Sequence, residues 1–171
     1  NSNNINIVGN LHYDPIGTQW TSVDNATFAA AENVTMPFRN SATDIIVDNA
    51  TAVLTGTWGT SSFNAGQFFG TNYRWSNTAG ASAKFTPNLP VAGTYRVYAM
   101  WNNGTDRART APFQIMHAGG VTTVTKSQRT GGGMWVYLGT YTFNAGTAGN
   151  VTISTSGSNG LIVADAIRFQ Q

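Results

Sequence analysis

The chain is built largely from short runs in which apolar and polar residues alternate, a pattern typical of β-strands with one buried face. The clearest run is TYRVYAMW at residues 94–101, where Tyr95, Val97, Ala99 and Trp101 share one face. We therefore expect a half-buried strand there, with these four side chains directed into a core.

Similar runs, separated by Gly, Asn or Pro, continue from Asp44 to the C-terminus. Besides residues 94–101, they are DIIVDN (44–49), TAVLTGTW (51–58), SAKFTP (82–87), PFQIMHAGGVTTVTK (112–126), MWVYLGTYTF (134–143), GNVTIST (149–155) and GLIVADAIRF (160–169). Residues 112–126 are expected to form a hairpin that turns at residues 118–120, and residues 59–72 a loop. About eight strands at this spacing predict an all-β fold, an antiparallel, jelly-roll-like β-sandwich over residues 44–171.

A further alternating run lies near the N-terminus, ahead of the predicted sandwich. Ile5, Ile7, Leu11 and Tyr13 share one face with Gly9. Together these apolar side chains would leave a large stripe in water, so another surface must cover them. The run can pair with an edge of its own sandwich, or it can insert into a neighbouring copy as a donor-type strand held by main-chain hydrogen bonds and side-chain pockets. Both alternatives remain open.

Residues 1–43 differ in pattern from the rest of the chain and are interpreted as an extended N-terminal arm. Within this arm Asp24 can cap one short helix that runs through Glu32, because three consecutive alanines favour a helix. The predicted organisation is therefore the arm, with a donor-type strand at about residues 5–13, followed by the sandwich of residues 44–171.

Composition narrows the set of partners. Asp, Glu, Lys and Arg make up 9% of the residues, against about 25% in an average globular protein, and the net charge is +2. So weak and scattered a charge does not favour nucleic acid or an anionic membrane. The sequence has no Cys, which excludes disulfides and thiolate metal sites, and no apolar run approaches the ~20 residues of a membrane span.

Eight short motifs occur in order along the predicted sandwich. They are VDN (47–49), TGTW (55–58), NYRW (72–75), LPVAGTYRVYAMW (89–101), AP (111–112), HAGGVTTVT (117–125), GGGMWVYLGTYTF (131–143) and VADAIRF (163–169). On these motifs, the region from about residue 44 to residue 169 resembles the golvesin/xanthan-lyase carbohydrate-binding-like domain. The resemblance implies a non-catalytic β-sandwich that accompanies bacterial polysaccharide-active or cell-wall enzymes as a glycan-binding or surface module. It assigns no binding residues, and residues 1–43 lie outside it.

The titratable residues do not favour an enzyme. Glycoside hydrolysis needs two carboxylates that flank one bond. The candidates for such a pair are Asp44, Asp48, Asp106 and Asp165. Each fits a structural position better, at a strand end, in a turn, or hydrogen-bonded to backbone in the closing motif. His12 and His117 have no second ligand at metal-binding spacing and are expected to be ordinary hydrogen-bonding side chains. We therefore expect no catalytic residues, no metal site and no cofactor. Oxygen ligands suited to calcium are abundant but lack EF-hand spacing, so calcium stays an open alternative.

Exposed aromatic rings indicate a binding function instead of a catalytic one. Sugar-binding sandwiches place flat Trp or Tyr faces against the C–H face of a pyranose, and amides and carboxylates bind its hydroxyls. The glycan-binding candidates, in or beside polar loops, are Tyr73, Trp75, Trp101, Asn103 and Asp106. The alternative for the large rings, among them Trp58, Trp101 and Trp135, is that they fill the core.

Two hypotheses for function follow. The first is a non-catalytic structural protein that self-assembles with copies of itself by exchange of the N-terminal strand. The alternative is a carbohydrate-binding module that recognises polysaccharide or cell-wall glycan. Both place the protein outside the cell or at its surface, where sequons can be glycosylated. The glycosylation candidates are Asn25, Asn33, Asn49, Asn103 and Asn150.

Overall fold

The computed structural model describes residues 44–171, in which all regular elements are β-strands. The strands are β1 (Ile45–Asp48), β2 (Val53–Thr55), β3 (Gly59–Ser61), β4 (Tyr73–Ser76), β5 (Ser82–Phe85), β6 (Gly93–Met100), β7 (Ala111–His117), β8 (Gly120–Lys126), β9 (Val136–Phe143), β10 (Asn150–Ser154), β11 (Ile162–Ala164) and β12 (Ala166–Gln170).

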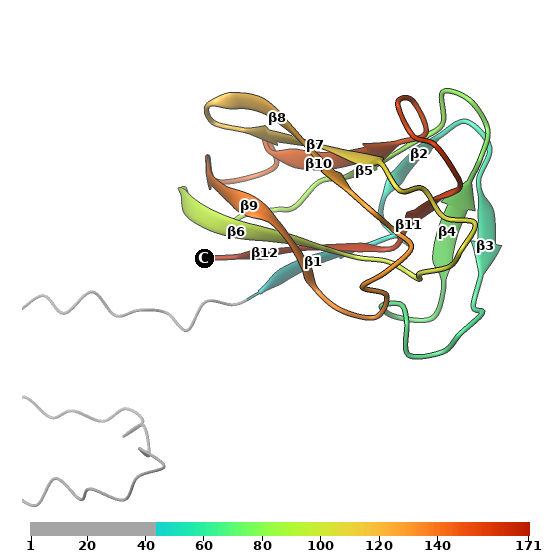
Figure 1. Ribbon diagram of the computed structural model, residues 1–171. Helices are drawn as coiled ribbons and strands as arrows, with labels where there is room; N and C mark the ends of the chain where they lie inside the picture. The colour runs from blue at the N-terminus through green and yellow to red at the C-terminus, as the bar shows by residue number, and fades with distance from the viewer. Residues whose placement is uncertain (1–43) are drawn as a thin grey trace, which may run out of the picture. The chain divides into compact units, whose positions relative to one another are not determined.

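These strands form three antiparallel sheets (Figure 1). One has four strands in the order β1-β12-β6-β9, and the second has five in the order β2-β5-β10-β7-β8. Figure 1 shows them as the two layers of a sandwich. The third sheet, β11-β4-β3, closes one end of the sandwich, opposite the turn of the β7–β8 hairpin.

The core lies between the two larger sheets, where the alternation of the sequence directs every second side chain. Tyr95, Val97 and Ala99 of β6 face Phe113 and Ile115 of β7, and all five are buried. The other strands of the two sheets contribute Val47, Ala83, Phe85, Leu138, Phe143, Val151, Ile153, Ile167 and Phe169. Each large apolar side chain stabilises the fold by roughly 1.5–3 kcal/mol through burial.

The sandwich confirms the predicted all-β fold class, and strands occur in each of the predicted runs. The hairpin predicted for residues 112–126 is also present, with its turn at residues 118–119.

The structure differs from the prediction at two places. Both lie at the end of the sandwich that the third sheet closes. Residues 59–72, expected to be a loop, begin with β3, which pairs with β4. The run Gly-Thr-Ser has no apolar alternation, so only its partner strand makes it recognisable as β-structure. The closing run 160–169 divides at Asp165 into β11, paired with β4, and β12, paired with β1 and β6.

The features predicted for residues 1–43 lie outside the described residues. They are the donor-type strand with Ile5, Ile7, Gly9, Leu11 and Tyr13, the short helix, and the sequons at Asn25 and Asn33. Each stays a prediction. For the part of the chain that the structure does describe, no helix has the length and apolar character to cross a bilayer.

Candidate functional site

A cavity of about 350 Å³ opens beside the third sheet, and its volume lies within the range typical of small-ligand sites. It is lined by Ser61, Phe63, Tyr73, Trp75, Asp106, Arg107 and Leu161. These residues come from β3 and the loop after it, from β4, from the β6–β7 loop, and from the residue before β11. A second cavity, beside His117 and Phe143, has a volume of about 30 Å³, which holds little more than one water molecule.

Phe63 and Trp75 form the apolar wall of the larger cavity. Phe63 stands on the loop after β3 and, at 68%, has the highest exposed fraction among the large apolar side chains of the described residues. Trp75 is half-buried on β4, and its cross-strand partner is Gly59. A Cβ atom at Gly59 would overlap the indole ring, so the backbone of β3 lies directly against Trp75 and fixes its position.

Asp106 and Arg107 form the polar wall. Arg107 Nη1 donates to both carboxylate oxygens of Asp106, at 2.8 and 2.9 Å. The Asp106 side chain is 65% exposed, whereas that of Arg107 is only 11% exposed. Leu161 holds this loop through the backbone, because its N–H donates to the Asp106 carbonyl and its carbonyl accepts from the N–H of Ala108.

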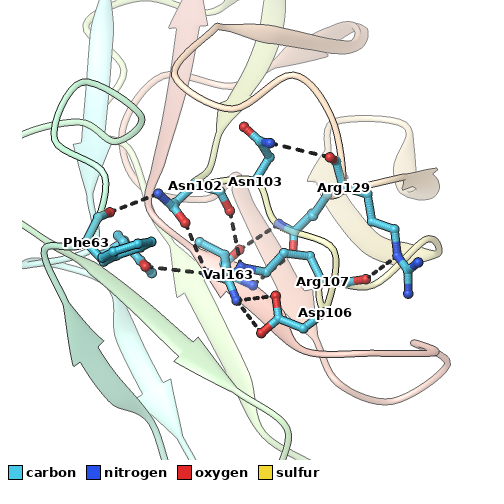
Figure 2. Close-up of polar contacts among 9 residues, drawn as sticks. Phe63, Asn102, Asn103, Asp106, Arg107, Arg129 and Val163 are labelled. Carbon is cyan, nitrogen blue, oxygen red and sulfur yellow. Dashed lines mark hydrogen bonds and ion pairs between the residues drawn. The ribbon is translucent and has the colours of Figure 1, made fainter.

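Two buried amide side chains fix segments near the cavity: Asn102 connects two loops (Figure 2), and Gln128 bonds strand β11. Asn102 is 0% exposed; its Nδ2 donates to the Phe63 carbonyl and its Oδ1 accepts from Arg107 Nη2, both at 3.0 Å. Gln128 is equally buried and bonds both backbone groups of Val163, at 2.7 and 2.8 Å. Because an unpaired buried amide is costly, these bonds favour one arrangement of the loops.

Asp165 anchors the far end of the β3–β4 loop. Its two carboxylate oxygens accept the Phe69 N–H at 3.2 and 3.1 Å, which confirms the predicted hydrogen bond to backbone. The side chain is 1% exposed. Burial raises its pKa to about 8; the bond from Phe69 opposes this shift and the nearby charge of Asp48 reinforces it. The buried carboxyl group therefore supports the loop and lies away from the lining of the cavity.

Within residues 44–171 no three His, Cys, Asp or Glu side chains come close enough together to hold a metal ion. His117 has the ordinary hydrogen-bonding role predicted for it: Nε2 lies 3.0 Å from Thr122 Oγ1, and Nδ1 accepts the Gly119 N–H at 3.1 Å. Asp44 forms an ion pair with Arg168 at 3.4 Å, on the four-stranded sheet.

The structure brings together Tyr73, Trp75 and Asp106, three of the predicted glycan-binding residues, around one cavity. Tyr73 is 2% exposed, so its ring has no free face for a sugar, and its hydroxyl oxygen accepts a hydrogen bond from Arg107 Nη2 at 3.4 Å. Trp101 lies elsewhere: it is 1% exposed and packs against Phe113, with ring centroids 6.0 Å apart. It continues the inward-facing row of β6 and fills the core, so it has no free face for a sugar.

Asn103 also lies outside the lining of the cavity. Its Nδ2 donates to the Arg129 carbonyl at 3.4 Å (Figure 2), which ties the β6–β7 loop to the segment before β9. Core packing was also the alternative for Trp58 and Trp135. Both of these side chains are half-buried. Trp135 packs against Phe69 rather than lining the cavity.

The sequons in the described residues differ in access. Asn49 is 2% exposed, and its Nδ2, the atom to which a glycan would be attached, donates to the Asn72 carbonyl at 2.8 Å. That geometry leaves no room for a sugar on Asn49. Asn103 and Asn150 are half-buried, and glycosylation at either stays a prediction.

Sequence reasoning does not identify Ser61, Phe63, Arg107 or Leu161 as site residues, although they complete the cavity. They come from three segments far apart in the sequence and share no motif, so only the folded arrangement brings them together. The one sequence signal is Phe63 itself, an aromatic residue among the small and polar residues of SSFNAG, where no strand pattern explains it.

A family model described as the Golvesin C-terminal domain matches residues 45–171. A xanthan lyase of Bacillus sp. (strain GL1) is 42% identical over 134 residues, which cover 73% of this chain and 14% of that protein. The structure of Paenibacillus xanthan lyase matches with a TM-score of 0.72 at 40% identity, over 75% of this chain and 13% of that one. The chain therefore spans only a small part of the xanthan lyases it matches.

Carbohydrate-binding modules share the fold at low identity. A family 35 carbohydrate-binding module from Clostridium thermocellum matches with a TM-score of 0.50 and 16% identity, over 75% of this chain and 96% of the module. A Podospora anserina GH26-CBM35 β-(1,4)-mannanase matches with a TM-score of 0.57 and 15% identity, over 75% of this chain and 28% of that one. The described sandwich thus has the fold of these carbohydrate-binding modules. The comparisons do not bear on self-assembly.

Proposed function

Since this chain belongs to the Golvesin C-terminal domain family, we propose that its β-sandwich is a non-catalytic module that binds polysaccharide through the cavity beside the third sheet. The observation that carries this proposal is the pairing, in one cavity, of an apolar wall of Phe63 and Trp75 with a polar wall that exposes the Asp106 carboxylate.

The two walls suit the two chemical faces of a sugar. The C–H groups of a pyranose ring pack on aromatic side chains, and the hydroxyls need acceptors and donors at the margin of the ring. Asp106 supplies acceptors and Ser61 a hydroxyl that both donates and accepts. Because the loops are fixed by Asn102 and Gln128, little conformational entropy is lost when a glycan binds.

Such a ligand occurs chiefly outside cells and at their surfaces. We therefore assign the module to an extracellular setting, where it would hold a protein or an enzyme on its polysaccharide. Self-assembly through residues 5–13 is not part of this proposal, because no observation on residues 44–171 favours it.

Affinity electrophoresis in gels that contain soluble polysaccharides tests the proposal. We expect Phe63→Ala and Trp75→Ala each to weaken the retardation of the protein about tenfold, the loss of roughly one aromatic contact. Tyr137→Ala and Trp135→Ala are the matched controls: Tyr137 is a second exposed ring, Trp135 a second half-buried indole, and neither lines the cavity.

Thermal unfolding of all four variants identifies any that lose their fold. Equal retardation of the cavity variants and the controls would refute the assignment of the site. Absence of retardation of the wild-type protein by every polysaccharide in a broad panel would refute the binding function.

A further inference from the structure

Each of the three nitrogens of the Arg107 guanidinium group donates a hydrogen bond within the protein, and its charge is paired with that of Asp106 (Figure 2). Only 11% of the side chain is exposed. Nη1 donates to the two oxygens of Asp106, and Nη2 donates to Tyr73 Oη at 3.4 Å and to Asn102 Oδ1 at 3.0 Å. Nε donates to the Asn102 carbonyl at 3.4 Å. Arg107 therefore acts as a structural cation that holds the polar wall in place.

The exposed member of this ion pair is the Asp106 carboxylate. It is 65% exposed, and each of its oxygens accepts one contact from Arg107. A carboxylate has about four lone-pair sites, so each oxygen can accept a further hydrogen bond from a hydroxyl. It has no proton to donate, and a second carboxylate placed beside it would be repelled.

No other cation in the described part of the chain lines the cavity. Arg74 lies between Tyr73 and Trp75 on β4 and projects from the opposite face of the strand, where it donates to Thr60 Oγ1. Arg129 donates from Nε to the Arg107 carbonyl at 2.9 Å and points away from the cavity lining (Figure 2). The guanidinium that a negatively charged ligand would meet there is therefore already paired with a carboxylate.

We infer that the cavity takes neutral sugar residues and excludes those that carry a carboxylate. This inference rests on the proposed function, which it narrows to a class of ligand. The hydroxyls of a neutral sugar donate to Asp106 while its C–H face packs on Phe63 and Trp75. A uronate would lose the water around its charge without gaining a cationic partner, and would lie near the charge of Asp106.

The test compares dissociation constants, from affinity electrophoresis at physiological ionic strength, for neutral and acidic polysaccharides. The neutral set is β-glucan, galactomannan and xylan; the acidic set is pectate and alginate, each also in a carboxyl-reduced form. We expect the tightest ligand to be neutral and every acidic polysaccharide to bind at least about tenfold more weakly. An acidic polysaccharide that binds as tightly and loses affinity on carboxyl reduction overturns the inference but leaves the proposed function standing. No binding to any member overturns the proposed function itself.

Asp106→Asn provides a second, independent readout. The substitution removes the charge that compensates Arg107 and leaves its guanidinium as a cation beside the cavity. The affinity for acidic polysaccharides, divided by that for neutral ones, should then rise about tenfold. Asp44→Asn is the matched control, because Asp44 is also paired with an arginine, Arg168, but lies away from the cavity. An equal shift in both variants, or none in Asp106→Asn, overturns the role given to Asp106.

Discussion

At the scale of single residues, the site depends on Gly59 as much as on the aromatic ring of Trp75 beside it. Trp75 keeps its place against β3 because Gly59 has no side chain. We predict that Gly59→Ala moves the indole and weakens polysaccharide binding about as much as Trp75→Ala does, although no ligand-contacting group is removed. Affinity electrophoresis measures the loss of binding, and the change in Trp fluorescence reports the movement of the ring.

Gly93→Ala is the control for this prediction. A Cβ atom at Gly93 would come too close only to the side-chain amide of Gln171, the far end of a flexible side chain that can move aside. We expect this variant to retain full binding. Full binding by Gly59→Ala as well would show that Trp75 has room to adjust and that its position is not fixed by β3.

At the scale of elements, the loop between β3 and β4 is held by polar side chains that are themselves buried. Asn102 fixes its start through Phe63, Asp165 fixes Phe69, and Asn49 donates to the carbonyl of Asn72 at its end. A loop with so many fixed points presents Phe63 in one position, as a binding platform requires.

Asp165 is expected to make this fold less stable as the pH rises. Burial raises its pKa from 3.8 to about 8, against the opposing bond from Phe69 and with support from Asp48. The folded state therefore keeps a proton that the unfolded chain releases, so the stabilisation is complete below about pH 4 and is lost as the pH rises through about 8. Urea titrations should show the free energy of unfolding falling by more than ~1 kcal/mol between about pH 5 and about pH 9.

Asp165→Asn separates this effect from other titrations. The amide oxygen still accepts the Phe69 N–H but binds no proton in this range. The stability of the variant should vary less with pH than that of the wild-type protein. Parallel pH dependences of the two proteins would show that Asp165 is ionised in the folded state throughout.

The same elements show how far the sequence predicts the structure. Alternation identifies β6, β7 and β10 because their buried faces repeat every second residue and the signal is local. It misses β3, whose β-structure depends on β4. It correctly directs Trp101 into the core, and only the position of this residue beside a polar loop made it a glycan-binding candidate. Tyr73, Trp75 and Asp106 are predicted by residue type, whereas Phe63 and Leu161 join them only through long-range contacts that no local pattern encodes.

At the scale of the whole molecule, residues 44–171 hold every part that the proposed function needs. Both large sheets, the core between them and the seven lining residues named above lie in this range. The family match begins at residue 45, and the alignment covers 96% of a solved family 35 module. A segment that matches a complete module should fold without its neighbours in the chain.

We therefore predict that residues 44–171, produced alone, give a single cooperative unfolding transition and bind polysaccharide with the affinity of the full chain. Calorimetry and affinity electrophoresis measure the two properties.

Sedimentation of both proteins then tests the role of the strand predicted at residues 5–13. If that strand inserts into a neighbouring copy, only the full chain forms oligomers, and glycan binding is the same in both. If it pairs with its own sandwich, both proteins are monomers and the shorter one is less stable, because the apolar face on which the strand packs would be left in water.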